Sequence, residues 1–330
     1  MRPEITRRVA LGAAGTALLS AAAGPLRAAP VERTARFIVN SAPGTNSDLV
    51  ARLYNERLRE SYAPQMVVDN RAGAAGRIGL EVLKSSAPDG ATIAITHDTS
   101  LTIYPHIYPR TLRYDLARDF IVVAPLGAFP FSLAVPANGQ IKDFKQFAEW
   151  AKGRSGSIFA SSGAGSAPHF LAMEMCKAVG LQSSHVPYRD TGMILGDLQG
   201  QRLDFAMQVL GSHAELHRAG QIRSLAISAP ERSPLIPDVP TFAELGYPQL
   251  TLEEWYVLLV PHGTPAPLVT ALRSATVAAA GDAALRDGLA RVGLRVVSAT
   301  PEELQERLVS QTKRWGDIVR ESGFTVEEAR

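Results

Sequence analysis

The run FSLAV at residues 131–135 ends at Pro136 and is one of two long apolar segments that decide the fold. The other is WYVLLV at residues 255–260, which lies between turn signals. Continuous apolar runs of this kind are typical of buried strands. Because they bracket a block of alternating strands and helices, we expect the chain to leave a first lobe near residue 132, build a second lobe, and return near residue 255. Two such crossing strands would form a hinge, and a cleft between hinged lobes is a preferred ligand site.

Strand-like and helical patterns alternate on both sides of the first run. This order predicts an α/β fold in which largely parallel sheets are flanked by helices. Two further helices are expected within 265–291, and Thr300, Pro301 and Glu303 mark the start of an amphipathic helix that ends near Gly323. The expected strands lie at 37–39, 66–68, 92–95, 157–160, 185–186 and 204–207, and the expected helices at 47–62, 78–83, 168–179 and 193–198.

The composition is that of an ordinary globular protein. The chain has 330 residues, of which 46% are hydrophobic and 20% are charged, so about two domains are expected. The formal net charge is +2 and no basic tract occurs, which argues against a nucleic-acid partner. The one cysteine, Cys176, excludes an internal disulfide and a cysteine-rich metal site. No metal and no cofactor is expected.

The first 29 residues have the pattern of an export signal. Arg7 and Arg8 precede an uncharged apolar run from Val9 to Ala23, and small residues follow as far as Ala29. The run is shorter than the roughly 20 residues that a helix needs to span a bilayer. The pattern predicts a signal peptide at 1–29 and a mature protein in the periplasm. The paired arginines favour twin-arginine export, and Sec export stays open.

Two turns between a strand and a helix are candidate ligand sites. The first covers residues 42–48 and the second residues 161–169, and both are rich in glycine and serine. Free backbone N–H groups at such helix starts suit a carboxylate or phosphate. For the first turn, plain capping by Ser47 or Asp48 is the alternative. In the second, Pro168 stands where a dinucleotide motif needs its third glycine, so dinucleotide binding is not expected. Residues 69–79 are interpreted as a structural loop that leads into a helix.

The sequence contains no recognisable catalytic motif. A Gly-x-Ser-x-Gly elbow and a phosphate-binding loop are both missing. His213 and His217 are four residues apart, but no third metal ligand accompanies them, so we interpret them as a solvated helix face. Cys176 lies within a helical pattern and is expected to be a buried thiol. No catalytic residue is therefore assigned.

Short motifs along the whole mature chain, from about residue 37 to 323, resemble one family of receptors. In this order and spacing they are similar to the Bug-type solute receptors of tripartite tricarboxylate transporters. The motifs are Pro43-Gly44 with Asp48, residues 69–79, residues 87–90, Tyr114-Asp115 with Asp119-Phe120, residues 161–166 with His169, Val186-Pro187-Tyr188, residues 232–241 and Trp255.

The resemblance implies a periplasmic binding protein of type II-like fold, with two α/β lobes and two hinge strands. It divides the chain into a first lobe of residues 30–132 and 255–330, including the C-terminal helices, and a second lobe of residues 133–254. The ligand would be a small carboxylate or a related compound, held largely by backbone N–H groups. The implied ligand-binding residues are Pro43, Gly44, Thr45, Asn46, Ser47, Asp48, Thr96, Asp98, Ser161, Ser162, Gly163, Gly165, Ser166, His169, Tyr188, Arg189, Asp190, Thr191 and Gln208. A valine at Gly165 is expected to abolish binding and leave the fold intact.

Three departures from the family pattern bear on the ligand. Thr45 replaces the second glycine of the first turn, Arg189 is followed by Asp190 rather than glycine, and Gln208 stands where amino-acid-binding relatives have an acidic residue. Our hypothesis is that the receptor lacks a partner for a ligand ammonium, unless Asp190 or Asp98 substitutes. A non-amino carboxylate, an amide or an aromatic acid is then favoured over aspartate-like ligands.

The resemblance also implies partners. A closed, ligand-bound monomer would be recognised by the membrane permease subunits of a tripartite transporter. Two alternatives stay open at this point. One is a sensory receptor whose closed form docks on a sensor kinase, and the other is an exported enzyme that uses His169 or His97 as a base on a small carboxylic acid.

Overall fold

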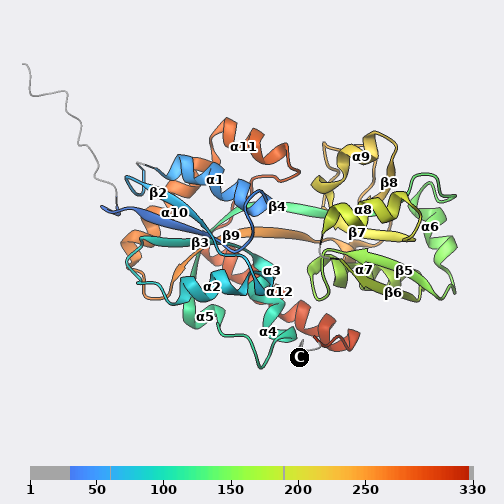
Figure 1. The fold of residues 1–330 in the computed structure, drawn as a ribbon, viewed down its shortest axis with the longest axis horizontal. Coiled ribbons are helices and arrows are strands. Elements are labelled where there is room, and N and C mark those ends of the chain that lie inside the picture. The colour runs from blue at the N-terminus through green and yellow to red at the C-terminus, as the bar shows by residue number, and fades with distance from the viewer. Residues whose placement is uncertain (1–29, 60, 189, 327–330) are drawn as a thin grey trace, which may run out of the picture.

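The computed structural model describes residues 30–59, 61–188 and 190–326, and the predicted signal peptide and Arg189 lie outside them. The elements alternate as the sequence predicts (Figure 1). They are β1 (Ala35–Val39), α1 (Asn46–Leu58), β2 (Met66–Asn70), η1 (Ala74–Gly76), α2 (Arg77–Lys84), β3 (Thr92–His97), α3 (Asp98–Thr102), α4 (Tyr104–Ile107), α5 (Leu116–Asp119), β4 (Phe120–Pro136), α6 (Phe144–Ala151), β5 (Ser157–Ser161), α7 (Ala167–Val179), β6 (Ser183–Pro187), α8 (Thr191–Gln199), β7 (Phe205–Val209), η2 (Leu210–Ser212), α9 (Ala214–Arg218), β8 (Ile222–Ile227), η3 (Pro248–Leu250), β9 (Glu253–Pro261), α10 (Ala266–Ala280), α11 (Ala283–Ala290) and α12 (Pro301–Ser322).

The strands form two groups that share β4. The order is β2-β1-β3-β9-β4-β7-β5-β6, and β8 also pairs with β4. Strands joined through helices pair in parallel, namely β1 with β2 and β3, and β5 with β6 and β7. The pairs that involve β9 or β4 are antiparallel. The parallel pairs agree with the α/β prediction, and each antiparallel pair involves β4 or β9, the strands that contain the two apolar runs.

Strand β4 runs through both lobes (Figure 1). Its residues 120–130 pair with β9, and its residues 131–136 pair with β7 and β8. The expected strand at 131–135 is therefore the second part of a longer one. Strand β9 pairs only with β3 and β4 among the described strands. The segment between β8 and β9, which leads back to the first lobe, is hydrogen-bonded to β4: the Phe131 carbonyl accepts from the Ser228 amide (2.9 Å). The lobe boundaries at 132 and 255 stay a prediction.

Each group of strands is covered by helices on both faces. In the first lobe, Phe37 and Val39 face the core that α1 and α10 help to form, whereas Ile38 between them faces α2 and α12. In the second lobe, Phe205 lies in the core shared with α7, and Ala206 beside it lies in the cluster formed with α8. This alternation is what a strand buried on both faces requires.

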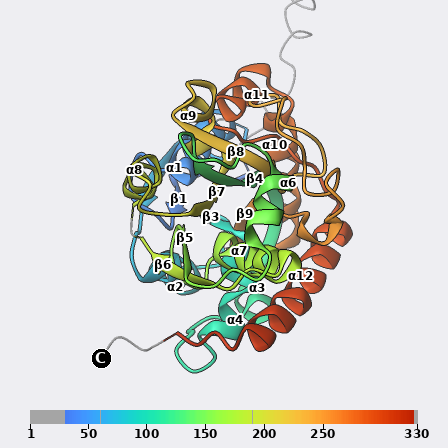
Figure 2. The same ribbon diagram turned by 90° about the vertical axis from the view of Figure 1, so that its right-hand side faces the viewer.

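Helix α12 packs along both lobes. It begins with the predicted capping box of Thr300 and Glu303, and it lies beside α3 and α4 (Figure 2). Near its end, Trp315 packs on Phe170 of α7, with ring centroids 6.1 Å apart. The prediction assigns this helix wholly to the first lobe, and the structure shows that its end also contacts the second.

Within the described residues, no single helix is long and apolar enough to cross a membrane. The bent pair α10–α11 meets the length and composition criteria for a span, and by those criteria alone.

Candidate functional site

The first candidate turn connects β1 to α1 and is rich in hydroxyl groups. Thr45 is the N-cap of α1, and its Oγ1 accepts from the Asp48 amide (3.4 Å). Neither Ser47 nor Asp48, the alternative capping residues, has this position. The Ser41 hydroxyl lies 2.6 Å from the hydroxyls of both Thr45 and Ser47. The β-branched Thr45 therefore closes the turn through its side chain. The amides of Asn46 and Ser47, which open the helix, receive no capping side chain.

The Asp48 carboxylate holds this turn in shape. It is 4% exposed and accepts from the Gly44 amide (2.9 Å), Arg52 Nε (2.9 Å) and Asn70 Nδ2 (3.0 Å). Burial by itself raises the pKa of Asp48, but the hydrogen bonds from Arg52, Gly44 and Asn70 outweigh it and lower the pKa below its ordinary value. Asp48 is thus an internal acceptor of the turn and supplies little free charge to a ligand.

The loop at residues 69–79 leads into α2, as predicted, and packs against the end of β1. A side chain at Gly79 would place its Cβ 2.7 Å from the Asn40 Cβ. Asn40 in turn donates to the Thr96 hydroxyl (2.8 Å). The resemblance implies that Thr96 binds the ligand, and this bond connects it to the residue just before Ser41.

Asp98 belongs to a separate, buried cluster of charges. Its side chain accepts from Arg307 (2.9 Å) and from the Trp255 amide (3.1 Å). Burial raises the pKa of Asp98 to about 6, with Arg307 pulling it down and Glu254 pushing it up. Burial likewise raises the pKa of Glu254 to about 7. Because Arg307 already pairs with Asp98, this carboxylate is not a free partner for a ligand ammonium.

The second candidate turn connects β5 to α7 and keeps the helix start uncapped. The Ser166 hydroxyl donates to the Gly163 carbonyl (2.7 Å) and does not cap α7. The Gly165 amide donates to His169 Nδ1 (3.0 Å). Gly163 has φ +99° and open space around its missing side chain. This turn therefore presents backbone and hydroxyl groups rather than charged side chains.

Gly165 has a packing role that the sequence did not reveal. A Cβ at this position would lie 3.0 Å from Ile107 Cδ1 and 3.1 Å from the Phe324 ring. A valine there would disturb the contact with α4 and with the residues after α12. The expectation that this substitution leaves the fold intact stays a prediction, and a valine at this φ of +76° would require Ile107 and Phe324 to shift.

A close pair of histidine rings, tilted by 31° to each other, lies next to the second turn. The rings of His169 and His185 are 4.0 Å apart, and His185 Nε2 lies 2.9 Å from the Ser161 hydroxyl. Burial lowers the pKa of His169 to about 3 and that of His185 to about 4. Both rings are therefore neutral at pH 7 and pack against Phe159.

The remaining predicted residues lie around α8 and β7. Tyr188 donates to Asp197 (2.6 Å), and Asp190 caps α8 by accepting from the Met193 amide (3.1 Å). Thr191 is the first residue of α8. Gln208 is fully buried and accepts from the Ser162 hydroxyl (2.8 Å), which ties β7 to the second turn.

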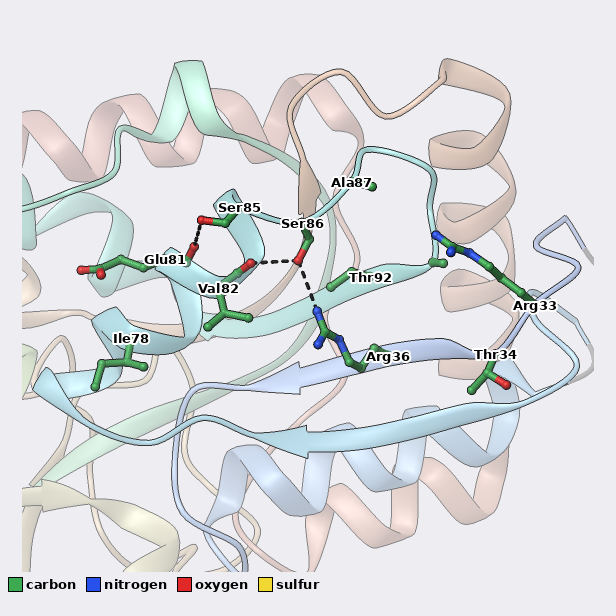
Figure 3. A pocket seen from close by; sticks show the side chains of 11 residues that line it. Arg33, Thr34, Arg36, Ile78, Glu81, Val82, Ser85, Ser86, Ala87 and Thr92 are labelled. Carbon is green, nitrogen blue, oxygen red and sulfur yellow. Dashed lines mark hydrogen bonds between the residues drawn. The ribbon is translucent and has the colours of Figure 1, made fainter.

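Two grooves elsewhere contain none of the predicted ligand residues. One, of about 690 Å³, lies on the first lobe between Arg36, Glu81, Ser86 and Thr92. In it Arg36 donates to the Ser86 hydroxyl (3.4 Å), and Ser86 donates to the Val82 carbonyl (2.8 Å) (Figure 3). The other, of about 540 Å³, is lined by residues 229–235 and by 293–296. Among the described residues, no group of three or more His, Cys, Asp or Glu could hold a metal ion.

His213 is fully buried, which contradicts the predicted solvated helix face. It is 1% exposed, whereas His217 pairs with Asp238 at 3.2 Å. Burial, with a smaller effect of His217, lowers the pKa of His213 to about 4. Cys176, in contrast, is the buried thiol that was expected, and burial raises its pKa to about 12.

We expect His213 to make the fold acid-sensitive. Its folded pKa of about 4 is below the ordinary 6.5, so its contribution is complete above pH 6.5 and is lost as the pH falls towards 4. Between pH 7.5 and pH 5 this costs about 2 kcal/mol of unfolding free energy. The free energy of unfolding of His213→Leu minus that of the parent, measured in urea, should therefore be about 2 kcal/mol larger at pH 5 than at pH 7.5. The exposed His262, replaced by glutamine, is the control. An equal difference at both pH values would contradict the prediction.

The fold and the two turns define the class of protein, a two-lobed receptor of the periplasmic-binding-protein type. The R. palustris protein Rpa4515, solved with adipate, aligns with a TM-score of 0.78 at 28% identity and covers 89% of this chain and 98% of its own. MatC from Rhodopseudomonas palustris, solved with bound malate, aligns with a TM-score of 0.74 at 28% identity, over 87% of this chain and 99% of that chain. BugT of Bordetella pertussis is 30% identical over 293 residues, which are 88% of this chain and 90% of BugT.

The chain belongs to the family described as the tripartite tricarboxylate transporter family receptor, whose model matches residues 50–324. This match and the similarity to BugT confirm the resemblance drawn from the sequence motifs. The chain is accordingly a periplasmic solute-binding receptor and not an enzyme.

Proposed function

We propose that this receptor binds a small organic acid in a cleft between its lobes, as a monomer, and delivers it to the membrane permease subunits of a tripartite transporter. The first turn and the second turn hold the acid from opposite sides. An export signal at residues 1–29 brings the receptor to the periplasm. The ligand shifts the receptor towards its closed form only to the extent that it binds the closed form more tightly than the open form.

The observation that carries this proposal is the uncapped start of α7. Its N-cap residue, Ser166, makes no side-chain bond to the helix amides. At α1 the Thr45 side chain caps only the Asp48 amide and leaves those of Asn46 and Ser47. Such amides carry the positive end of the helix dipole and favour a carboxylate. The relatives solved with malate and with adipate are similar in fold and sequence, which supports an acid as the ligand class.

The described carboxylates near these turns already bond other protein groups, which supports a ligand acid that carries no amino group. Asp48 bonds within the first turn, Asp98 pairs with Arg307, and Asp190 caps α8. Asp98 is therefore not well placed to substitute for the acidic residue that Gln208 replaces, and Asp190 already caps α8 with one of its oxygens. Aspartate and glutamate should bind weakly compared with acids that lack an ammonium group.

A thermal-shift screen tests the proposal. The mature protein is unfolded and refolded to remove any retained ligand and is then heated with mono-, di- and tricarboxylates, aromatic acids, aspartate and glutamate. An acid at about 100 times its Kd adds roughly 2.7 kcal/mol, which raises the Tm by roughly 5 °C. A selective shift with a non-amino acid is expected. No shift with any acid would contradict acid binding, and a preference for aspartate or glutamate would contradict the selectivity.

A further inference from the structure

The groove of about 540 Å³ has walls from both lobes, and we call it the junction pocket. One wall is the segment that follows β8 in the second lobe. The other is α11 and the segment that follows it in the first lobe, and α11 lies on the same side of β4 as α9 (Figure 1). The pocket contains none of the predicted ligand residues, so it is separate from the two turns. Its lining is Pro130, residues 229–235, Glu253, Arg286, Ala290 and residues 293–296.

The junction pocket lies where β4 passes from one lobe to the other. Up to Pro130, which stands opposite Glu253, β4 pairs with β9, and its residues 131–136 pair with β7 and β8. The lobes touch beside the pocket, because a Cβ on Gly293 would lie 2.7 Å from the Gly211 Cα and 3.2 Å from Leu235 Cδ1. A rotation of one lobe against the other therefore changes the distance between the two walls.

The pocket has the size and the apolar lining of a small-molecule site. Its volume of about 540 Å³ falls within the roughly 300–1,000 Å³ that such sites occupy. Such sites are mostly apolar and contain a few polar groups that orient the ligand. The large apolar side chains in this lining are those of Pro130, Pro230, Pro234, Leu235, Leu294 and Val296.

Two of the three arginines in the pocket already have carboxylate partners. Arg232 donates through Nε to Glu244 (3.0 Å), and Arg295 donates through Nε to Glu253 (2.9 Å). The hydrogen bond to Glu253, followed by the charge of Glu231, raises the pKa of Arg295 above its ordinary value. The two glutamates of the lining therefore both act on Arg295.

Arg286 is the third arginine, and its guanidinium has no hydrogen-bond or ion-pair partner among the described residues. It is exposed on α11 and lines the pocket. Because three arginines and two glutamates line the pocket, the lining carries one net positive charge. A guanidinium can hold a carboxylate or a similar anion through two parallel N–H groups. A monoanion would thus balance this charge and give Arg286 an acceptor.

We propose that the junction pocket binds a second small molecule, an organic monoanion with an apolar body, and that this binding is coupled to acid binding in the cleft. The anionic group accepts from Arg286, and the apolar body packs between residues 230–234 and Leu294. An occupant that contacts both walls binds the open and the closed arrangement of the lobes with different affinity. The affinity for the acid then changes by the same factor in return. The site goes beyond the proposed function, whereas the coupling rests on it.

Two matched dyes test the ligand class. One is the fluorescent monoanion 8-anilinonaphthalene-1-sulfonate, and the other is its uncharged analogue N-phenyl-1-naphthylamine. Fluorescence titration of the ligand-stripped mature protein should show saturable binding of one sulfonate dye per chain. The uncharged dye should bind at least tenfold more weakly, because it cannot bond Arg286. Equal affinity for the two dyes, or no saturable binding of the sulfonate, overturns the inference.

Three variants place the dye in the junction pocket. Arg286→Ala should weaken the sulfonate dye at least tenfold and leave the uncharged dye unchanged. Ala290→Trp should abolish binding of both dyes, since the indole fills the space between the walls. Arg291→Ala is the matched control, because Arg291 is also exposed but does not line the pocket. All three positions are exposed, so each variant should keep the Tm of the parent. Parent affinity for the sulfonate dye in either pocket variant overturns the inference.

The coupling is measured with the acid that gives the largest thermal shift. Saturating sulfonate dye should change the Kd of that acid at least fivefold in the parent and leave it unchanged in Ala290→Trp. Saturating acid should change the Kd of the dye by the same factor and then reach a plateau. A dye Kd that rises without limit as acid is added shows competition for one site and overturns the inference, and an acid Kd that the dye leaves unchanged in the parent overturns the coupling.

The outcomes separate this inference from the proposed function. If the parent binds no acid, the proposed function and the coupling both fail. The dye titrations of the parent, Arg286→Ala and Ala290→Trp still decide whether the junction pocket is a site. If the parent binds an acid and the pocket variants bind the dye as the parent does, the site is overturned and the proposed function stands.

Discussion

Replacing Arg307 with methionine is expected to destabilise the protein by about 3–5 kcal/mol at pH 8, because it leaves a buried carboxylate without its partner. Asp98 is 2% exposed, and Arg307 donates to its Oδ2 through Nε (3.2 Å) and an Nη (2.9 Å). The same guanidinium donates to the Glu253 carbonyl (2.7 Å) and lies 4.0 Å from the centre of the Trp255 ring. Guanidinium denaturation at pH 8 measures the loss.

The loss should be smaller at pH 5. The folded pKa values of Asp98 and Glu254 are raised, to about 6 and about 7, so the fold favours their neutral forms. Their contribution is present in acid and is lost as the pH rises through these values. Without Arg307, both carboxyls can take up protons at pH 5 and avoid a buried charge. The double variant Arg307→Met, Asp98→Asn is the control and should recover much of the stability at pH 8. An equal loss at both pH values would assign the effect to packing on Trp255 instead.

Replacing Asp48 with alanine is expected to lower acid affinity at least a hundredfold. The change leaves the Gly44 amide, Asn70 Nδ2 and Arg52 Nε without their shared acceptor. Gly44 has φ +82°, and its bond to Asp48 fixes the conformation in which the amides at the start of α1 are presented. Stability should fall by about 1–3 kcal/mol as well, since partly buried donors lose their partner. Calorimetry with the acid chosen by the screen measures the affinity.

Arg52→Gln is the matched control for the Asp48 variant. It removes the outer contact of the same carboxylate, from a side chain that is 52% exposed, and exposed pairs contribute about 0–1 kcal/mol. Affinity should therefore stay within a few-fold of the parent. If Asp48→Ala bound as tightly as the parent, the first turn would not be part of the ligand site.

Local residue patterns predicted much of the fold, but they did not predict the full length of β4. The periodicity of the parallel strands and of α12 can be read from neighbouring residues. In β4, the prolines at 125 and 130 and Gly127 look like strand breakers, so only residues 131–135 were predicted. The structure accommodates Pro125 and Gly127 with register shifts between residues 122 and 124 and between 125 and 127, whereas Pro130 stays in register opposite Glu253. A β-bulge tolerates a residue that interrupts the hydrogen bonds between strands, but no residue pattern in this sequence predicts where the bulge lies.

The candidate site was predictable where its chemistry is local. The two turns follow strands and open helices, as their glycine and serine content predicts. The pairing of Asp98 and the burial of His213 depend on residues far away in the chain, and His213 differs from expectation. Arg307 is 209 residues from Asp98, and Ser132 meets Gln208 only through strand pairing. Such contacts leave no periodic signal in one sequence.

The most direct test of the central claim is a calorimetric titration of the ligand-stripped mature receptor with the acid that gives the largest thermal shift. The account predicts saturable binding of one acid per chain, with the acid recovered chemically unchanged. It also predicts that binding is lost in Asp48→Ala and retained in Arg52→Gln. Absence of saturable heat, or equal binding by the parent and Asp48→Ala, would contradict a carboxylate site at the first turn.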